Sequence, residues 1–159
     1  EYGDYQCPWC AKFNTEGFQP MLAEYIATGK VRFEFRPFSF IGAESVAASK
    51  AVYCAADQGK FWAMHETIYG NHNGENQGAF SEDRLEKVAE VVGLDMEAYK
   101  TCFADPATAD RVEAANKVAR DAGVSSTPTF VVNGEVMGWP QDGYPVFKQV
   151  IDEALEAAS

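Results

Sequence analysis

The chain has 159 residues, of which 47% are hydrophobic and 13% aromatic, enough for one substantial core or for one domain that carries an insertion. Its formal net charge of -11 argues against a nucleic-acid partner, because phosphate backbones are bound by clustered Lys and Arg. No apolar run approaches the roughly 20 residues that cross a bilayer, so we expect a soluble domain that does not need its cysteines merely to fold.

The chain begins at Glu1 and reaches a cysteine motif, Cys7-Pro8-Trp9-Cys10, within its first ten residues. Because residue 1 is not Met, we expect that a preceding segment has been processed or truncated. A signal peptide or membrane anchor would lie in that segment and is not present in this chain, so its absence does not argue for the cytoplasm.

The two thiols of this motif can close a disulfide ring and open it again without moving the fold. Pro8 suits the first position of a helix, which places Cys7 where unpaired backbone N–H groups and the helix dipole stabilise a thiolate. We expect Cys7 to be the low-pKa nucleophile, and Cys10, shielded by Pro8 and Trp9, to be the resolving thiol. The alternatives are a static disulfide and half of a zinc site, but the sequence has no second Cys-x-x-Cys and no His-x-x-x-His.

Residues 8–28 have the apolar spacing of a helix, which Gly17 and Pro20 should bend or weaken in the middle. Residues 31–36 alternate apolar and charged side chains and predict a strand. By the right-handed crossover rule, this strand should pair in parallel with a strand just before the cysteine motif. Only the end of that first strand, near Glu1, is present.

Every signal from about residue 43 to residue 122 is helical, which predicts a block of about five helices. Ser81, Asp95 and Asp105 are the expected N-caps of the last three. The pattern then becomes extended, and Asn133-Gly134 between two apolar runs is the strongest short signal for a hairpin. A last helix is expected after Pro145.

Three segments of this sequence resemble the thioredoxin superfamily, and within it the bacterial DsbA-like thiol:disulfide oxidoreductases. They are residues 1–10 with the Cys-Pro-Trp-Cys motif, residues 124–134 with Thr127-Pro128-Thr129-Phe130 before the hairpin, and the helical block between them. The resemblance covers essentially the whole chain. It implies an α/β thioredoxin fold with an inserted all-helical domain. The thioredoxin-like domain would comprise residues 1–41 and 122–159, with its first strand truncated. The inserted helical domain would comprise residues 42–121.

The resemblance also implies roles for individual residues. A cis Thr127–Pro128 bond beside Cys7 would expose the Thr127 backbone to an extended substrate chain, whereas the residues alone would be read as a trans turn. Glu1 matches a buried acid that assists proton transfer at the resolving thiol. The alternative for Glu1 is a frayed, solvated terminal residue.

An apolar surface suited to unfolded client proteins is expected around Cys7, with Pro8 and Trp9 in contact with substrate. Ordinary core packing is the alternative for most of its aromatic members. These members are Trp9, Phe38, Phe40, Trp139 and Tyr144.

The remaining cysteines, Cys54 and Cys102, lie on predicted helices of the insertion. The resemblance includes actinobacterial members with a second disulfide in the helical domain, and two buried free thiols are the alternative. His65 and His72 have no partner at a telling spacing, so we expect core or surface histidines. No metal and no organic cofactor are expected.

The expected function is a thiol:disulfide oxidoreductase, an extracytoplasmic oxidase that donates the Cys7–Cys10 disulfide to exported proteins. Its partners would be the thiols of unfolded or exported proteins and, by family analogy, a membrane quinone-linked reoxidase. A disulfide isomerase or reductase is the alternative within the enzyme class. A non-catalytic peptide-binding chaperone or adaptor module and a zinc-stabilised interaction domain are the alternatives outside it.

Overall fold

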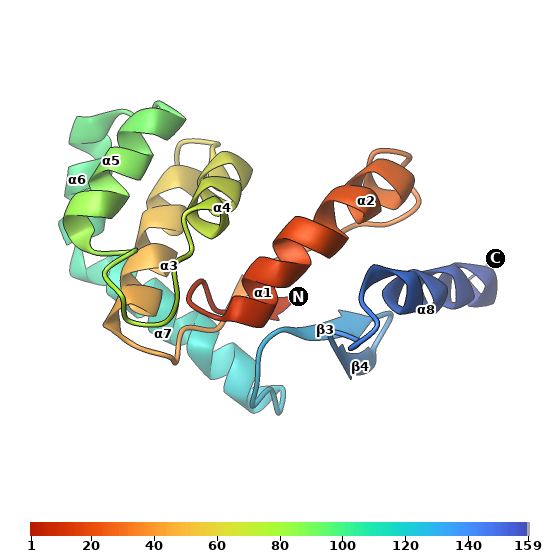
Figure 1. Ribbon diagram of the computed structural model, residues 1–159. Coiled ribbons are helices and arrows are strands. Elements are labelled where there is room, and N and C mark those ends of the chain that lie inside the picture. The colour runs from red at the N-terminus through yellow and green to blue at the C-terminus, as the bar shows by residue number, and fades with distance from the viewer. Residues whose placement is uncertain (159) are drawn as a thin grey trace.

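A four-stranded sheet of order β2-β1-β3-β4 organises the computed structural model, which describes residues 1–158. β1 (Tyr2–Gly3) pairs in parallel with β2 (Arg36–Pro37) and antiparallel with β3 (Thr129–Val132). β3 continues through a tight turn into β4 (Glu135–Gly138). The predicted parallel pairing just before the cysteine motif is confirmed. In Figure 1 the N-terminus lies between the helical block and the C-terminal hairpin.

The strand predicted over 31–36 is confirmed only at its end. The Arg36 N–H donates to the Glu1 carbonyl oxygen at 2.7 Å and the Phe38 N–H to that of Gly3 at 2.8 Å, whereas residues 31–35 lie outside the strand. Alternation indicates which side each residue faces, but it does not reveal how far a neighbouring strand extends. With a β1 of two residues, the ladder is short.

One continuous helical segment follows the cysteine motif and ends close to the predicted residue 28. It comprises α1 (Pro8–Phe13), the π-helical turn η1 (Asn14–Phe18), α2 (Gln19–Met21) and the π-helical turn η2 (Leu22–Ile26). The predicted disturbance in the middle therefore takes the form of widened turns. Pro20, which has no N–H to donate to the preceding turn, lies between them.

Gly17 allows this segment to approach the C-terminal part of the chain. A Cβ at Gly17 would lie 2.5 Å from the Trp139 ring and 2.6 Å from the Phe13 ring. Trp139 also packs against Phe130 and Phe147, with ring centroids 6.2 and 5.4 Å away. Trp139 is therefore a half-buried residue that packs against the core.

The helical block between β2 and β3 consists of the five predicted helices. Asp95 accepts hydrogen bonds from two backbone N–H groups and Asp105 from one, as expected of N-caps, whereas the Ser81 side chain makes no capping bond within residues 1–158. The predicted domain limits, 42–121, stay a prediction. The helices are α3 (Ala43–Ala56), α4 (Phe61–Gly70), α5 (Glu82–Val92), α6 (Met96–Ala104) and α7 (Pro106–Asp121).

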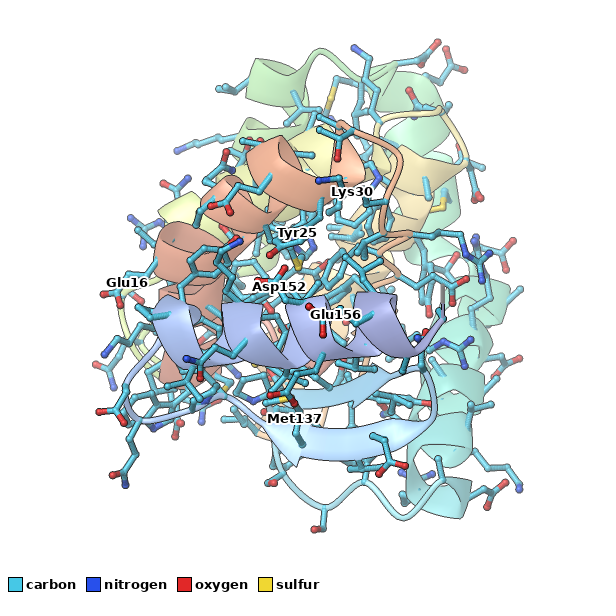
Figure 2. The ribbon with its side chains drawn as sticks, turned by 90° about the vertical axis from the view of Figure 1, so that its right-hand side faces the viewer. Glu16, Tyr25, Lys30, Met137, Asp152 and Glu156 are labelled. Atoms are coloured by element: carbon cyan, nitrogen blue, oxygen red, sulfur yellow. A yellow bond between two sulfur atoms is a disulfide. The ribbon has the colours of Figure 1, made fainter. Side chains whose placement is uncertain are left out.

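The C-terminal hairpin and helix follow the sequence pattern. Asn133 and Gly134 have φ angles of 48° and 96°, the positive values that a tight hairpin turn requires. α8 (Tyr144–Ala157) lies across the hairpin, and Tyr25 of η2 reaches Asp152 of α8 with a hydrogen bond (Figure 2).

The cysteine motif lies where two cores meet. Cys10 belongs to the core that the insertion shares with Tyr5 and Phe35. Phe13, less than one turn further on, belongs to the core that α8 and the hairpin form on one face of the sheet. No helix within residues 1–158 is both long and apolar enough to span a bilayer.

Candidate active site

The Cys7 sulfur lies at the start of α1, against a loop from the far end of the chain. Cys7 occupies the N-cap position with φ -71° and ψ 120°. Its Sγ donates to the Thr127 carbonyl oxygen at 3.2 Å, and the Thr127–Pro128 peptide bond is cis. Cys7 and Cys10 are both free thiols here. The fold thus brings together two segments that are 120 residues apart.

The surroundings of Cys7 stabilise its anion and lower the pKa of its thiol to about 6. The largest contribution is a hydrogen bond from the Cys10 side chain, which burial opposes. The Thr127 side chain and the backbone N–H groups of Cys10 and Trp9 add further hydrogen bonds. Hydrogen-bond donors at a helix N-terminus that point at a thiol favour its charged form.

Cys10 has the opposite character. Its side chain is fully buried, and burial raises its pKa well above the ordinary value, followed by the hydrogen bond that it gives to Cys7 and by the charge of Glu1. The surroundings therefore favour the anion at Cys7 and the neutral thiol at Cys10. The attacking anion and the neutral thiol are assigned by environment, because both residues are chemically identical.

Glu1 carries its carboxyl group inward instead of into solvent. Burial is the main cause that raises the pKa of Glu1 to about 8, against the lowering effect of the amino-terminal charge. Its Oε1 is buried and makes no hydrogen bond within residues 1–158, while the terminal amino group donates to the Glu34 carbonyl oxygen at 2.8 Å. The alternative of a solvated, frayed Glu1 is therefore wrong.

The residues expected to meet substrate differ in exposure. Pro8 and Trp9 are exposed beside Cys7, and 53% of the Trp9 surface is open to solvent. Thr127 is half-buried and Pro128 buried. Pro8 and Trp9 follow Cys7 in the chain and Thr127 is hydrogen-bonded to it, and the roles of these residues in substrate binding remain proposals.

The aromatic residues of the wider surface differ in their exposure. Phe40 is 51% exposed, but Phe38 is buried and Trp139 packs in the core against Phe13. Tyr144 is half-buried with a buried hydroxyl. Phe38 and Trp139 follow strands β2 and β4, and Tyr144 begins α8. Residue type alone does not reveal how much of such a side chain the neighbouring elements cover.

Sequence reasoning missed the buried polar residues directly before Cys7. Asp4 and Gln6 are fully buried. The Asp4 carboxylate accepts hydrogen bonds from the N–H groups of Gln6, Phe40 and Ile41 at 2.9, 2.9 and 3.1 Å. Adjacent polar residues beside a reactive cysteine were the available signal, but most of their partners lie more than 35 residues away.

His65 and His72 also contact this segment. His65 is buried, which lowers its pKa to about 3, and its ring bonds the Tyr5 hydroxyl at 3.1 Å and the Asn14 amide at 3.3 Å. His72 donates to the Gln6 carbonyl oxygen at 2.8 Å. Across residues 1–158, no three His, Cys, Asp or Glu side chains meet in a group that could bind a metal ion.

The second pair of cysteines is joined. A disulfide links Cys54 of α3 to Cys102 of α6 across 48 residues. Cys54 is buried and Cys102 half-buried. The bond fixes two helices of the insertion to each other, and Cys54 belongs to the same hydrophobic core as Cys7 and Cys10.

The sheet order, the helical block between β2 and β3, and the dithiol at the start of α1 define a thioredoxin fold with a helical insertion. A family model described as thioredoxin matches residues 1–153. The chain belongs to this thioredoxin family.

Known relatives narrow the class of protein to which this chain belongs. "Probable disulfide bond formation protein D" of Bacillus cereus is 29% identical over 161 residues, which cover 98% of this chain and 73% of that protein. The crystal structure of oxidised BdbD from Bacillus subtilis has a TM-score of 0.89 at 26% identity, covering 98% of this chain and 85% of that one. The α-DsbA1 structure from Wolbachia pipientis shows the same fold, with a TM-score of 0.85 at 20% identity over 99% and 84% of the two chains.

The protein is thus a DsbA-like protein disulfide oxidoreductase, and the predicted fold class is confirmed.

Proposed function

We propose that the protein is an extracytoplasmic oxidase that transfers the Cys7–Cys10 disulfide to exported proteins. The observation that carries this proposal is the contrast between the two thiols, with the Cys7 pKa lowered to about 6 and the Cys10 pKa raised. Each contact that stabilises the Cys7 thiolate favours the dithiol form, and the disulfide becomes a better oxidant. The name of the Bacillus cereus relative, which refers to disulfide bond formation, agrees with this direction.

The proposed reaction starts from the Cys7–Cys10 disulfide. A substrate thiolate attacks the Cys7 sulfur, the bond to Cys10 breaks, and Cys10 leaves and takes up a proton. A second substrate thiolate then attacks the substrate sulfur of the mixed disulfide, and Cys7 leaves as a thiolate. Two substrate thiols lose two electrons, which the enzyme disulfide gains, so the products are a substrate disulfide and the enzyme dithiol.

The leaving step explains why a stable Cys7 anion favours this direction. In thiol–disulfide exchange, a thiol of lower pKa leaves faster. Cys7 therefore releases an oxidised substrate readily. Cys10, held neutral, competes poorly to return the mixed disulfide to the starting state.

Substrate docking is proposed at the Thr127 backbone, with Pro128 holding the loop and with Pro8 and Trp9 as the exposed contacts beside the sulfur. A main-chain edge binds extended peptides without reading their sequence, which suits a donor for many unfolded proteins. Regeneration of the disulfide is assigned by analogy to a membrane quinone-linked reoxidase.

Glu1 is proposed to exchange the proton of Cys10. A buried carboxyl with a pKa of about 8 can both hold and release a proton near neutral pH. In the Glu1→Gln variant, the rate of substrate oxidation should become less dependent on pH between roughly 6 and 9. A profile that overlaps that of the wild type would remove Glu1 from the mechanism.

The decisive experiment is the redox equilibrium of Cys7–Cys10 with glutathione, together with oxidation of a reduced, unfolded client protein. An oxidase should show a potential nearer to about -120 mV than to the -270 mV or so of thioredoxin. A potential near the latter value would favour a reductase. If Cys7→Ser leaves client folding unchanged, the protein is a peptide-binding module instead. The Cys54→Ala/Cys102→Ala variant is the control, since it removes two cysteines but keeps the proposed dithiol.

A further inference from the structure

The three residues directly before Cys7 are held one by one by side chains of the helical insertion. The Tyr69 hydroxyl donates to the Asp4 carbonyl oxygen at 3.4 Å. The Tyr5 hydroxyl bonds His65 Nδ1 at 3.1 Å. These contacts join the thiol-bearing segment to α4, which lies in another part of the sequence.

Gln6 makes the most extensive of these connections. Its Nε2 donates to Ser45 Oγ at 3.0 Å and to Asn76 Oδ1 at 3.3 Å, and its Oε1 accepts from the Asn76 N–H at 2.6 Å. Its carbonyl oxygen accepts from His72 Nε2 at 2.8 Å. Gln6 is fully buried, and each of its side-chain polar atoms is bonded to the insertion.

The loop that receives Gln6 is itself fixed. The Glu44 carboxylate accepts from the N–H groups of Gly78 and Phe80 at 2.9 and 2.8 Å. Gly42 leaves room for Asn76, because a Cβ at Gly42 would lie 2.2 Å from Asn76 Oδ1. A buried hydrogen-bond network with these restraints can hold a backbone segment in one conformation.

The backbone at residues 6 and 7 decides where the Cys7 sulfur points. Cys7 N donates to the Asp4 carbonyl oxygen at 3.0 Å, closing a turn over residues 4–7. The donors that stabilise the thiolate come from Trp9 and Cys10 of α1 and from Thr127 of the loop before β3. A small rotation of the backbone at Gln6 would carry the sulfur away from them.

We propose that Gln6 is a positioning residue for the Cys7 thiolate, acting through the backbone that it ties to the helical insertion. This inference rests on the proposed function, because it names a determinant of the same site. The insertion thereby contributes to the reactivity of a thiol that lies outside it. Gln6 touches no reacting atom and takes no part in the exchange itself.

The test compares the Cys7 thiolate titration, followed by thiolate absorbance, in the wild type and in Gln6→Met. Met has a similar volume but cannot make the three side-chain hydrogen bonds to Ser45 and Asn76, whereas the backbone carbonyl that accepts from His72 stays. We expect the Cys7 pKa to rise to roughly 7 and the equilibrium constant for oxidation of glutathione to fall about tenfold. His72→Ala, at a half-buried position, removes the bond to the Gln6 carbonyl and a ring contact with Phe80 but keeps the side-chain bonds of Gln6, and should shift both readouts in the same direction by less.

The control is Ser49→Ala, which removes the buried 2.7 Å hydrogen bond between Ser49 and Ser39 without touching residues 4–7. It should lower the stability of the insertion but leave the thiolate titration in place. If Gln6→Met and His72→Ala titrate like the wild type, the inference is wrong even though the enzyme is active. If Gln6→Met does not fold, His72→Ala decides alone. A wild type that does not exchange with glutathione would instead overturn the proposed function.

Discussion

At the scale of single residues, the site separates two identical side chains by their surroundings. The Cys7 sulfur lies at an N-cap position with several donors around it, and Cys10 is fully buried one turn later. Because both sulfurs share one helix, no movement of the fold is needed to pass from dithiol to disulfide. The difference in pKa is therefore a property of the helix start and of the Thr127 loop.

The stability of the reduced protein should depend on pH through Cys7. Its pKa is about 6 in the folded protein and about 8.5 in an unfolded chain, so ionisation stabilises the fold fully above the unfolded value, and this contribution is lost as the pH falls through 6. Urea unfolding of the reduced protein and of Cys7→Ser should show a difference in unfolding free energy that grows by roughly 1–2 kcal/mol from pH 6 to pH 8.

Glu1 also titrates in this range. The unfolding free energies of the wild type and of Cys7→Ser are therefore compared with each other at each pH, and not between pH values for one protein. The Glu1 contribution then largely cancels. A difference that is the same at pH 6 and pH 8 would contradict a stabilised thiolate at Cys7.

The reacting residues of the candidate site could be predicted from sequence, but their supports could not. The spacing of Cys7 and Cys10 and the position of Pro8 are local features, and local chemistry indicates their roles. Gln6 is different, because its partners Ser45 and Asn76 lie 39 and 70 residues away. A buried glutamine looks the same in a sequence as an exposed one.

At the scale of elements, the segment after the cysteine motif departs most from regular geometry. Two π-helical turns flank Pro20, and Gly17 lies in the first of them. Helical periodicity predicted the segment, and Gly17 and Pro20 predicted its weak point. The close approach of the Trp139 ring could not be predicted, because it depends on how α8 and the hairpin pack on the other side.

Two glycine substitutions separate packing from helix propensity. Gly17→Ala places a Cβ 2.5 Å from Trp139, and we expect it to lower the unfolding free energy by about 1–3 kcal/mol, since overpacking outweighs the gain of about 1 kcal/mol in propensity. The measurement is urea unfolding, with the Cys7–Cys10 pair held reduced.

The matched control is Gly70→Ala at the end of α4. A Cβ there would meet no atom of residues 1–158 within 4 Å beyond its own helix backbone and chain neighbours, so propensity alone should act and raise the stability by roughly 0.5–1 kcal/mol. Equal effects of both substitutions would mean that the Trp139 contact is not formed in solution.

The strands show that sequence analysis predicts local pairing better than pairing between distant segments. The hairpin at Asn133-Gly134 was predictable because the turn residues and both strands are neighbours in the chain. β2 was predicted too long, over 31–36 instead of Arg36–Pro37, because its length depends on β1. The alternation of apolar and polar residues in one segment does not reveal its pairing with a segment more than 30 residues away.

At the scale of the whole molecule, the insertion is both a separate helical body and a partner of the sheet. Asn116 of α7 exchanges two hydrogen bonds with the backbone of Ser39, at 2.7 and 3.0 Å. Ala119 of the same helix packs with Tyr2 and Phe38. We propose 42–121 as the limits of the helical domain, with α7 as the element that anchors it.

Removing the second disulfide should weaken this body without changing the site. Cys54 and Cys102 close a loop of 48 residues, and for a loop of that length the Cys54→Ala/Cys102→Ala variant is expected to lose about 2–4 kcal/mol of unfolding free energy. Thermal unfolding followed by circular dichroism measures the loss.

The same variant should keep the thiolate titration and the glutathione equilibrium of Cys7–Cys10. A large change in either would mean that the Cys54–Cys102 bond also acts on the reacting pair. Cys7→Ala/Cys10→Ala, which keeps the Cys54–Cys102 bond, is the matched comparison for stability.

The hydrogen bond between Cys7 and Thr127 joins two residues that are synthesised at different times, because 120 positions separate them. A growing polypeptide contains Cys7 before it contains Thr127 and the hairpin behind it, which are made more than a hundred residues later. Until they arrive, Cys7 lacks the Thr127 donor that helps to hold its anion, and the edge proposed for clients does not exist. A nascent molecule would thus be a weaker nucleophile toward the cysteines of its neighbours than the finished enzyme is toward its substrates.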